Sequence, residues 1–205
     1  VDDLRARASG GIRIWCSAAS TGEEPYSIAM TVTEALGANH GTRIIASDID
    51  TNVLAKAGSG VYPLDSRGLS PERLRQHFLR GKGAQSGLSR VKPELARMIE
   101  FRVQNLMDAR WSLGDPFDIV FCRNVMIYFD AATQRKVLEK IHATMKPHGL
   151  LYVGHSENFT EARHLFRLRG PYPPATRSSR RVADADRAFA ERMQALVEAV
   201  RPNPA

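Results

Sequence analysis

The strongest constraint on the fold of this chain is a regular alternation between short apolar runs and segments with helical periodicity. The apolar runs have the length and the Val, Ile and Phe content of buried strands. Because helices separate consecutive strands, right-handed crossovers join them, and a parallel sheet covered on both faces results. The predicted strands are residues 12–16, 43–47, 99–104, 117–122 and 149–153.

Helical segments fill the gaps between these strands. Residues 25–36 open on Pro25, whose missing N–H costs nothing in a first helical turn. A second helix begins over residues 51–57, and a third runs from its cap, Asp130, to residue 145. The Lys-Pro-His-Gly sequence that follows is expected to end this third helix.

The stretch between residues 61 and 99 breaks the alternation. A helix starting at Ser70 is followed by glycine-rich turns on both sides of a short β-type run, residues 88–91. This pattern predicts a small antiparallel β-subdomain, inserted over about residues 70–98.

The chain changes character after residue 170. Prolines and basic residues over 171–182 cannot form a central strand, and we interpret them as a linker. Apolar residues at helical spacing predict a terminal helix and tail over 183–205. The main domain is therefore expected to cover residues 1–170.

Composition indicates an ordinary water-soluble globular protein, with 43% hydrophobic and 25% charged residues in 205. No apolar run approaches the roughly 18 residues of a membrane span, and the polar start of the chain is no secretion signal. Cys16 and Cys122 lack the spacing of a disulfide framework or a zinc site. We therefore expect a cytoplasmic protein with reduced thiols and no metal.

The net charge of +7 is unevenly distributed. Residues 67–102 carry nine basic and three acidic side chains, and residues 163–181 carry six basic and no acidic ones. Such patches suit an acidic partner, which could be nucleic acid, an anionic membrane face or an acidic protein. A solvated basic surface explains each patch equally well.

Residues with ligand-binding chemistry follow four of the predicted strands. In an open parallel sheet, ligands bind outside the carboxyl ends of the strands, where the strand order reverses. Small residues around Ala18 let a backbone approach a ligand closely, and Asp48 could accept both hydroxyls of a ribose. The other candidates at these ends are Asn105, Leu106, Cys122, Arg123 and Asn124.

The loop after the first strand also restricts the type of ligand. It has neither of the glycine patterns that cradle a pyrophosphate or a triphosphate, and it carries two carboxylates, Glu23 and Glu24. These acids would repel an anion and attract a cation. S-adenosylmethionine, with its adenosine, sulfonium and ammonium groups, satisfies these conditions. A structural turn with solvated acids is the alternative.

Four segments in register resemble the CheR family of chemotaxis receptor methyltransferases. They are CSAASTGEEPYS at 16–27, ASDID at 46–50, FCRNVMIYF at 121–129 and GHSEN at 154–158, and the similarity extends over about residues 12–170. The resemblance implies a class I methyltransferase fold, a Rossmann-like doubly wound sheet. It also implies S-adenosylmethionine as methyl donor and glutamate side chains of membrane chemoreceptors as acceptors.

The resemblance also assigns roles to individual residues. Asp48 would bind the ribose, although it could instead cap the next helix. Glu23 would lie near the cationic methionine end, whereas Glu24 could be a first-turn acid favoured by the helix dipole. The remaining cofactor contacts are assigned to Ala18, Asn105, Leu106, Cys122, Arg123 and Asn124.

Tyr128 and Arg123 are the residues expected nearest to the transferred methyl group. The Tyr128 phenol could orient the acceptor, and an ordinary core aromatic is the alternative interpretation. His155 is expected to be structural rather than a catalytic base. A glutamate carboxylate, with a pKa of about 4.3, is already ionised at neutral pH and needs no base. The enzyme mainly has to align two reactants and exclude water.

The inserted subdomain resembles the β-subdomain with which the family can bind a receptor's C-terminal tether peptide by adding a strand. Arg80, Arg90 and Lys92 would then face an acidic peptide. The family also has a helical N-terminal domain, for which this chain begins too late, and a closing strand that the Pro171 region interrupts.

These departures leave other functions open. One is an S-adenosylmethionine-binding regulatory module, and another is a methyltransferase of the same fold that acts outside chemotaxis. The basic patches alone suggest an RNA methyltransferase, but no basic stretch interleaved with aromatic residues supports binding to nucleic acid. We expect a monomer that acts on chemoreceptor cytoplasmic domains and does not insert into the membrane.

Overall fold

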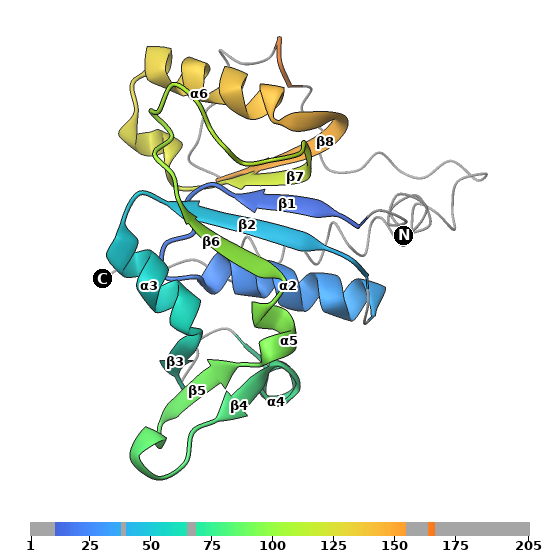
Figure 1. Cartoon of the computed structure of the whole chain (residues 1–205), viewed down its shortest axis with the longest axis vertical. Helices are drawn as coiled ribbons and strands as arrows, with labels where there is room; N and C mark the ends of the chain where they lie inside the picture. Colours follow the sequence, from blue (N-terminus) through green and yellow to red (C-terminus); the bar gives the residue numbers. More distant parts are fainter. Residues whose placement is uncertain (1–10, 38–39, 65–68, 155–163, 167–205) are drawn as a thin grey trace, which may run out of the picture.

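The computed structural model describes residues 11–37, 40–64, 69–154 and 164–166 (Figure 1). The expected linker, the terminal helix and His155 lie outside the described residues. Within the described ranges, no helix has both the length and the apolar character needed to cross a bilayer.

The centre of the fold is a five-stranded sheet in the order β6-β2-β1-β7-β8, and every neighbouring pair in it is parallel. This confirms the predicted parallel sheet. The order runs outward in opposite directions from β1, so the strand order reverses between β1 and β7. The strands are β1 (Arg13–Cys16), β2 (Arg43–Asp48), β6 (Ile99–Val103), β7 (Phe117–Cys122) and β8 (Met145–Val153).

Two faces of this sheet are covered by helices, as predicted. Helices α2 (Glu23–Leu36) and α3 (Thr51–Ser59) lie on one face, and α6 (Ala131–Ala143) lies on the other (Figure 1). Alternate residues along the strands divide the core into two layers. Ile14, Cys16, Ile44, Ala46 and Phe121 belong to the layer of α2, and Trp15, Ile45, Val120 and Cys122 to that of α6.

The junction between α6 and β8 differs from the prediction. The helix begins after its cap, Asp130, whose carboxylate accepts a hydrogen bond of 2.7 Å from the Thr133 N–H, but it ends at residue 143 rather than 145. Strand β8 begins at residue 145, because Met145 pairs with Phe117. The next recorded partners are Leu150 and Ile119, so the proline-containing stretch between them bulges out of the ladder.

A second sheet forms the insertion that the sequence predicted. It is antiparallel, in the order β3-β5-β4, and lies beyond α3 and α5 from the main sheet (Figure 1). Its first strand lies ahead of residue 70, where the sequence placed the start of the subdomain. The elements are β3 (Val61–Pro63), α4 (Pro71–His77), β4 (Phe78–Arg80), η2 (Gly83–Gln85), β5 (Leu88–Val91) and α5 (Pro93–Ala96).

A charged cluster fastens this subdomain to the main domain. From α4, Arg73 donates two hydrogen bonds, of 2.7 and 3.0 Å, to the two carboxylate oxygens of Glu34 on α2. His77, which is buried, lies 2.9 Å from one of the same oxygens. Burial by itself raises the pKa of Glu34, but the hydrogen bonds and charges of Arg73 and His77 outweigh it and leave that pKa below its usual value.

Replacing this carboxylate tests how far it stabilises the fold. We expect Glu34→Gln to lower the free energy of unfolding at pH 7 by about 1–3 kcal/mol, because charge-assisted hydrogen bonds are lost in a mostly buried site. A lowered folded-state pKa means that the contribution is complete above the ordinary value of 4.5 and is lost as the pH falls through the lowered one.

Urea unfolding at pH 7 and at pH 4 measures both effects. The difference between wild type and variant should be smaller at pH 4. Glu139→Gln is the control, since Glu139 pairs with Arg135 on the exposed side of α6 and should change stability by less than about 0.5 kcal/mol. Equal losses of unfolding free energy in Glu34→Gln and Glu139→Gln would contradict the stabilising role of the Glu34 cluster.

Candidate functional site

The loop after β1 is bonded to both neighbouring strands. The Ser17 N–H donates to the Phe121 carbonyl of β7, and the Ala19 N–H to the Ser47 carbonyl of β2, both at 2.9 Å. Ala18 is half-buried between these two anchors. Main-chain hydrogen bonds therefore hold the loop of small residues across the carboxyl ends of β1, β2 and β7.

Gly22 lets this loop turn into α2 beside α3. Its φ is +96°, and a Cβ at this position would lie 2.7 Å from the Tyr62 hydroxyl oxygen and 2.9 Å from the Ala57 Cβ. The Tyr62 hydroxyl donates to the Thr21 carbonyl at 2.8 Å. Only glycine relieves both the backbone strain and the clash, so this position fixes where the loop ends.

Asp48, at the end of β2, is oriented by two backbone groups. Its carboxylate accepts hydrogen bonds from the Ser20 N–H at 2.8 Å and from the Asp50 N–H at 3.1 Å. The cap of α3 is Asp50, which accepts a bond of 2.7 Å from the Asn52 N–H, so the alternative role of Asp48 as the cap is wrong. Each Asp48 oxygen retains acceptor capacity, as binding to ribose hydroxyls would require.

Two residues other than glycine adopt left-handed backbone conformations just beyond the strand ends. They are Ser20, with φ +47°, and Asn124, with φ +55°. One follows β1 and the other follows β7, so they flank the reversal in strand order. Strained conformations of this kind persist where surrounding contacts impose them, and they cluster at functional sites.

Glu23 and Glu24 have different surroundings. Glu24 lies in the first turn of α2 and pairs with Arg123, with 2.8 Å between Oε1 and Nη1, and both side chains are mostly buried. This pair joins the start of α2 to the end of β7. Glu23 is exposed and accepts a bond of 2.6 Å from the Thr21 hydroxyl. Of the two acids, Glu23 is therefore the one whose carboxylate is exposed to solvent.

The residues after β6 form a turn that a hydrogen bond between two of its own residues stabilises. The Asn105 side-chain oxygen accepts a bond of 2.8 Å from the Met107 N–H, and Leu106 is buried in the core layer of α6. Met107, by contrast, is half exposed. The roles of Asn105 and Leu106 toward a cofactor stay predictions.

Exposed apolar side chains surround these strand ends. Among the described residues, five of the six large exposed hydrophobic side chains end a strand of the main sheet, lie in the loop that follows one, or lie in η3 (Met126–Tyr128); Leu79 is the other. Of the five near these strand ends, the sequence analysis singled out only Tyr128. The position of Ile49 directly after Asp48 could have indicated an apolar surface beside the predicted ribose site. The five are Ile49, Val103, Met107, Ile127 and Tyr128.

Tyr128 stands out in this group, because 79% of it is exposed. The alternative of an ordinary core aromatic is therefore wrong. The turn η3 follows β7 and Asn124, so Tyr128 lies beyond the strand end where the sequence placed it. Its phenol is exposed to solvent at this edge of the sheet.

Neither Cys16 nor Cys122 forms a disulfide, and both side chains are fully buried. Burial raises the pKa of the Cys16 thiol well above its ordinary value, and the charge of Glu24 raises it further. Cys122 packs in the core layer of α6. Neither buried position favours thiolate chemistry.

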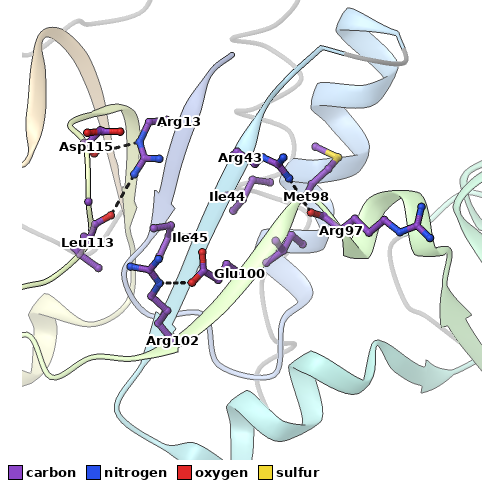
Figure 2. A pocket seen from close by; sticks show the side chains of 12 residues that line it. Arg13, Arg43, Ile44, Ile45, Arg97, Met98, Glu100, Arg102, Leu113 and Asp115 are labelled. Carbon is purple, nitrogen blue, oxygen red and sulfur yellow. Dashed lines mark hydrogen bonds and ion pairs between the residues drawn. The ribbon is translucent and has the colours of Figure 1, made fainter. Parts of the chain in front are cut away.

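A hollow at the opposite edge of the sheet is separate from this site. Arg13 and Arg43, which line it, are the first residues of β1 and β2, and Leu113 and Asp115 precede β7 (Figure 2). Asp48 and Arg123 lie at the other ends of the same strands. The hollow therefore does not belong to the carboxyl-end site.

The chemistry at the carboxyl ends fits S-adenosylmethionine. Asp48 offers acceptors for ribose hydroxyls, exposed Ile49 and Met107 offer apolar surface for an adenine, and Glu23 offers a negative charge for the cationic end. Together with the strand order, these features define a class I methyltransferase of the Rossmann-like, doubly wound type.

Comparison with known proteins identifies the family. Residues 2–171 match the family described as CheR methyltransferase, SAM binding domain, and the chain belongs to it. The chemotaxis protein methyltransferase of Escherichia coli K12 is 49% identical over 170 residues, which cover 82% of this chain and 59% of that protein. The chemotaxis protein methyltransferase of Salmonella typhimurium LT2 is 51% identical, over 80% of this chain and 58% of that protein.

A third relative, chemotaxis protein methyltransferase 2 of Pseudomonas aeruginosa PAO1, is 52% identical over 80% of this chain and 60% of its own length. The chain thus spans about three-fifths of these relatives. The match confirms the predicted family and its cofactor, S-adenosylmethionine.

The ribose assignment can be tested on Asp48 directly. We expect Asp48→Asn to weaken binding of S-adenosylmethionine at least tenfold, or about 1.4 kcal/mol, because an amide offers a single acceptor oxygen where the carboxylate offers two. Isothermal titration calorimetry measures the dissociation constant. Asp50→Asn is the matched control, since asparagine also caps helices and affinity should stay within twofold. Unchanged affinity in Asp48→Asn would remove Asp48 from the site.

Proposed function

We propose that this chain transfers the methyl group of S-adenosylmethionine to glutamate side chains in the cytoplasmic domains of chemoreceptors. The product is a glutamate methyl ester, a modification suited to chemotaxis adaptation. The observation that carries this proposal is the identity of about half of the residues with proteins named chemotaxis protein methyltransferases. We place the reaction in the cytoplasm and the active chain as a monomer that contacts neither nucleic acid nor the membrane interior.

The residues at the strand ends divide the work of binding. Asp48 would hold the ribose, Ile49 and Met107 would border the adenine, and Glu23 would compensate the positive charge. Ala18 and Asn124 would let the backbone come close, with Asn105, Leu106 and Cys122 framing the same edge. When bound, the donor supplies an electrophilic methyl group on a sulfonium. Water exclusion by the exposed apolar side chains would favour the attack of a carboxylate on that group.

No general base is required of this chain. The acceptor glutamate is ionised at neutral pH, so its oxygen already has the electron pair for the new O–CH3 bond. The pair of the broken S–CH3 bond would stay on the sulfur of the product, S-adenosylhomocysteine. Tyr128 would orient the acceptor, because its exposed phenol can donate a hydrogen bond or cover the reacting groups. Arg123 is committed to Glu24 in this structure and would act by holding the two loops together. Alignment, rather than proton transfer, is then the main contribution of the protein.

The small sheet supports the further proposal that a receptor's C-terminal tether binds to this chain. Within the described residues, β3 and β4 each pair only with β5, so each has an edge that can accept another strand. Arg80 and Arg90 are exposed on this sheet, Lys92 follows it and is partly exposed, and Leu79 offers an apolar contact. An acidic peptide with an apolar side chain is the complementary partner.

The activity can be measured as transfer of labelled methyl to receptor-containing membranes, released by alkali as expected for an ester. We expect Tyr128→Ala to slow this transfer at least tenfold and to leave the affinity for S-adenosylmethionine within twofold, because the phenol meets the acceptor. Tyr128→Phe removes only the hydroxyl and so distinguishes its contribution to the rate from that of the ring. Cofactor binding without any transfer by the wild-type chain would favour a regulatory module over an enzyme.

The tether proposal has its own test. We expect Arg90→Glu to weaken binding of an acidic receptor-tail peptide at least fivefold in fluorescence anisotropy, because an opposite charge would repel the peptide. Arg135→Glu, on the exposed side of α6, is the control and should bind as the wild type does. Equal binding by the wild type, Arg80→Glu and Arg90→Glu would refute this partner.

A further inference from the structure

The connection from β6 to β7, residues 104–116, contains no helix or strand. Its carbonyl groups therefore lack the regular partners that a helix would supply, and they need donors from elsewhere. The segment nevertheless covers the core layer of α6, because Leu106, Trp111 and Leu113 pack there. The main-chain carbonyls of this segment therefore depend on hydrogen bonds from individual side chains.

Three cationic side chains supply these donors. Lys140 donates from Nζ to the carbonyls of Leu106, at 2.9 Å, and Asp108, at 2.8 Å. Arg102 donates to the Ser112 carbonyl at 2.9 Å. Arg13 donates to the carbonyls of Leu113 and Asp115, both at 3.2 Å, across the hollow at the start of the strands (Figure 2).

Lys140 differs from the two arginines in the part of the segment that it holds. Its bonds end on the turn that follows β6, whereas Arg13 and Arg102 hold the far half toward β7. The same turn carries Asn105 and the exposed Met107, at the edge where the cofactor site was placed. Lys140 is thus the polar link from α6 to the candidate adenosine end of the site.

The surroundings of Lys140 hold the ammonium in one place. Its Nζ lies 4.6 Å from the centroid of the Trp111 ring, a cation–π contact, and Trp111 packs edge-on against Trp15 at 5.2 Å. Burial lowers the pKa of Lys140, which the nearby Asp108 carboxylate partly opposes. The Lys140 ammonium is therefore surrounded by two main-chain carbonyls, the Trp111 ring and the Asp108 carboxylate.

A second side chain of α6 performs the same task on the other side of the site. Gln134 donates from Nε2 to the carbonyls of Met126 and Phe129, both at 3.0 Å. These two bonds bracket η3, which carries Tyr128. One helix therefore holds both the turn after β6 and the turn after β7, through donors to their main chains.

We propose that Lys140 is a positioning residue of the cofactor site, which fixes the turn at residues 105–108 so that its side chains meet the adenosine. This inference rests on the proposed function, because it takes the adenosine end to lie at β2 and β6. Lys140 does not contact the cofactor in this account. It acts through the main chain of Leu106 and Asp108.

The test compares Lys140→Met with Lys140→Arg in the full chain. We expect Lys140→Met to weaken binding of S-adenosylhomocysteine at least tenfold in calorimetry and to speed hydrogen exchange of the Met107 and Asp108 amides, which bond to Asn105. Lys140→Arg keeps the charge and the donors and should restore affinity to within threefold. Lys136→Met, at an exposed position of the same helix, should change neither quantity.

Two further variants separate positioning from direct contact and from general instability. Asp48→Asn should weaken binding without faster exchange at residues 107 and 108. Val137→Ala, in the core of α6, should lower the melting temperature but keep affinity within twofold. An equal loss of affinity in Val137→Ala and Lys140→Met would overturn the proposal, and so would faster exchange in Lys140→Met with unchanged affinity.

Failure of the proposed function gives a different result. If methyl transfer fails while S-adenosylhomocysteine still binds, the test of Lys140 is unaffected; if the wild-type chain binds no S-adenosylhomocysteine, the role of Lys140 toward the adenosine is refuted. The exchange rates would then decide by themselves whether Lys140 orders the turn: unchanged rates in Lys140→Met would refute that part as well.

Discussion

The parallel pairing of β1 with a neighbour on each side is the constraint on which the rest of this structure depends. Because β2 and β7 flank β1 and run in the same direction, three carboxyl ends meet at one edge where the strand order reverses. The loop after β1 crosses this edge on hydrogen bonds to both neighbours. Asp48 and Arg123, far apart in sequence, thereby lie at the same edge of the sheet, and no local preference of either segment would place them there together.

The site is held by a few polar contacts between loops rather than by regular structure. Asp48 orients the loop after β1 through the Ser20 N–H, and the Glu24–Arg123 pair joins the start of α2 to the end of β7. On the opposite face, Gln134 and Lys140 of α6 hold the turns beyond β7 and β6. Such contacts keep the exposed apolar side chains in fixed places, as a pre-organised binding surface requires.

The inserted subdomain is also held by a few polar contacts between segments. Its small sheet has little core of its own, so its position depends on α4, which the Glu34 cluster fastens to α2. A peptide bound at the exposed arginines of this sheet would thus be attached to a subdomain whose position relative to the main domain is fixed. A tethered partner and the site at the strand ends would be held at a defined separation, which raises the local concentration of an acceptor.

The sequence by itself determined the order and type of most elements, since hydrophobic periodicity and capping residues are local signals. It also determined the family, because four motifs occur in register, and the positions of the candidate site residues follow from them. Only the tertiary structure decided that Asp50 caps α3 while Asp48 faces Ser20, that β8 begins at Met145 opposite Phe117, and that Tyr128 is exposed. Lys140 and Gln134 escaped sequence reasoning for the same physical reason: their partners are main-chain carbonyls on other segments, and a carbonyl leaves no mark in the pattern of side chains.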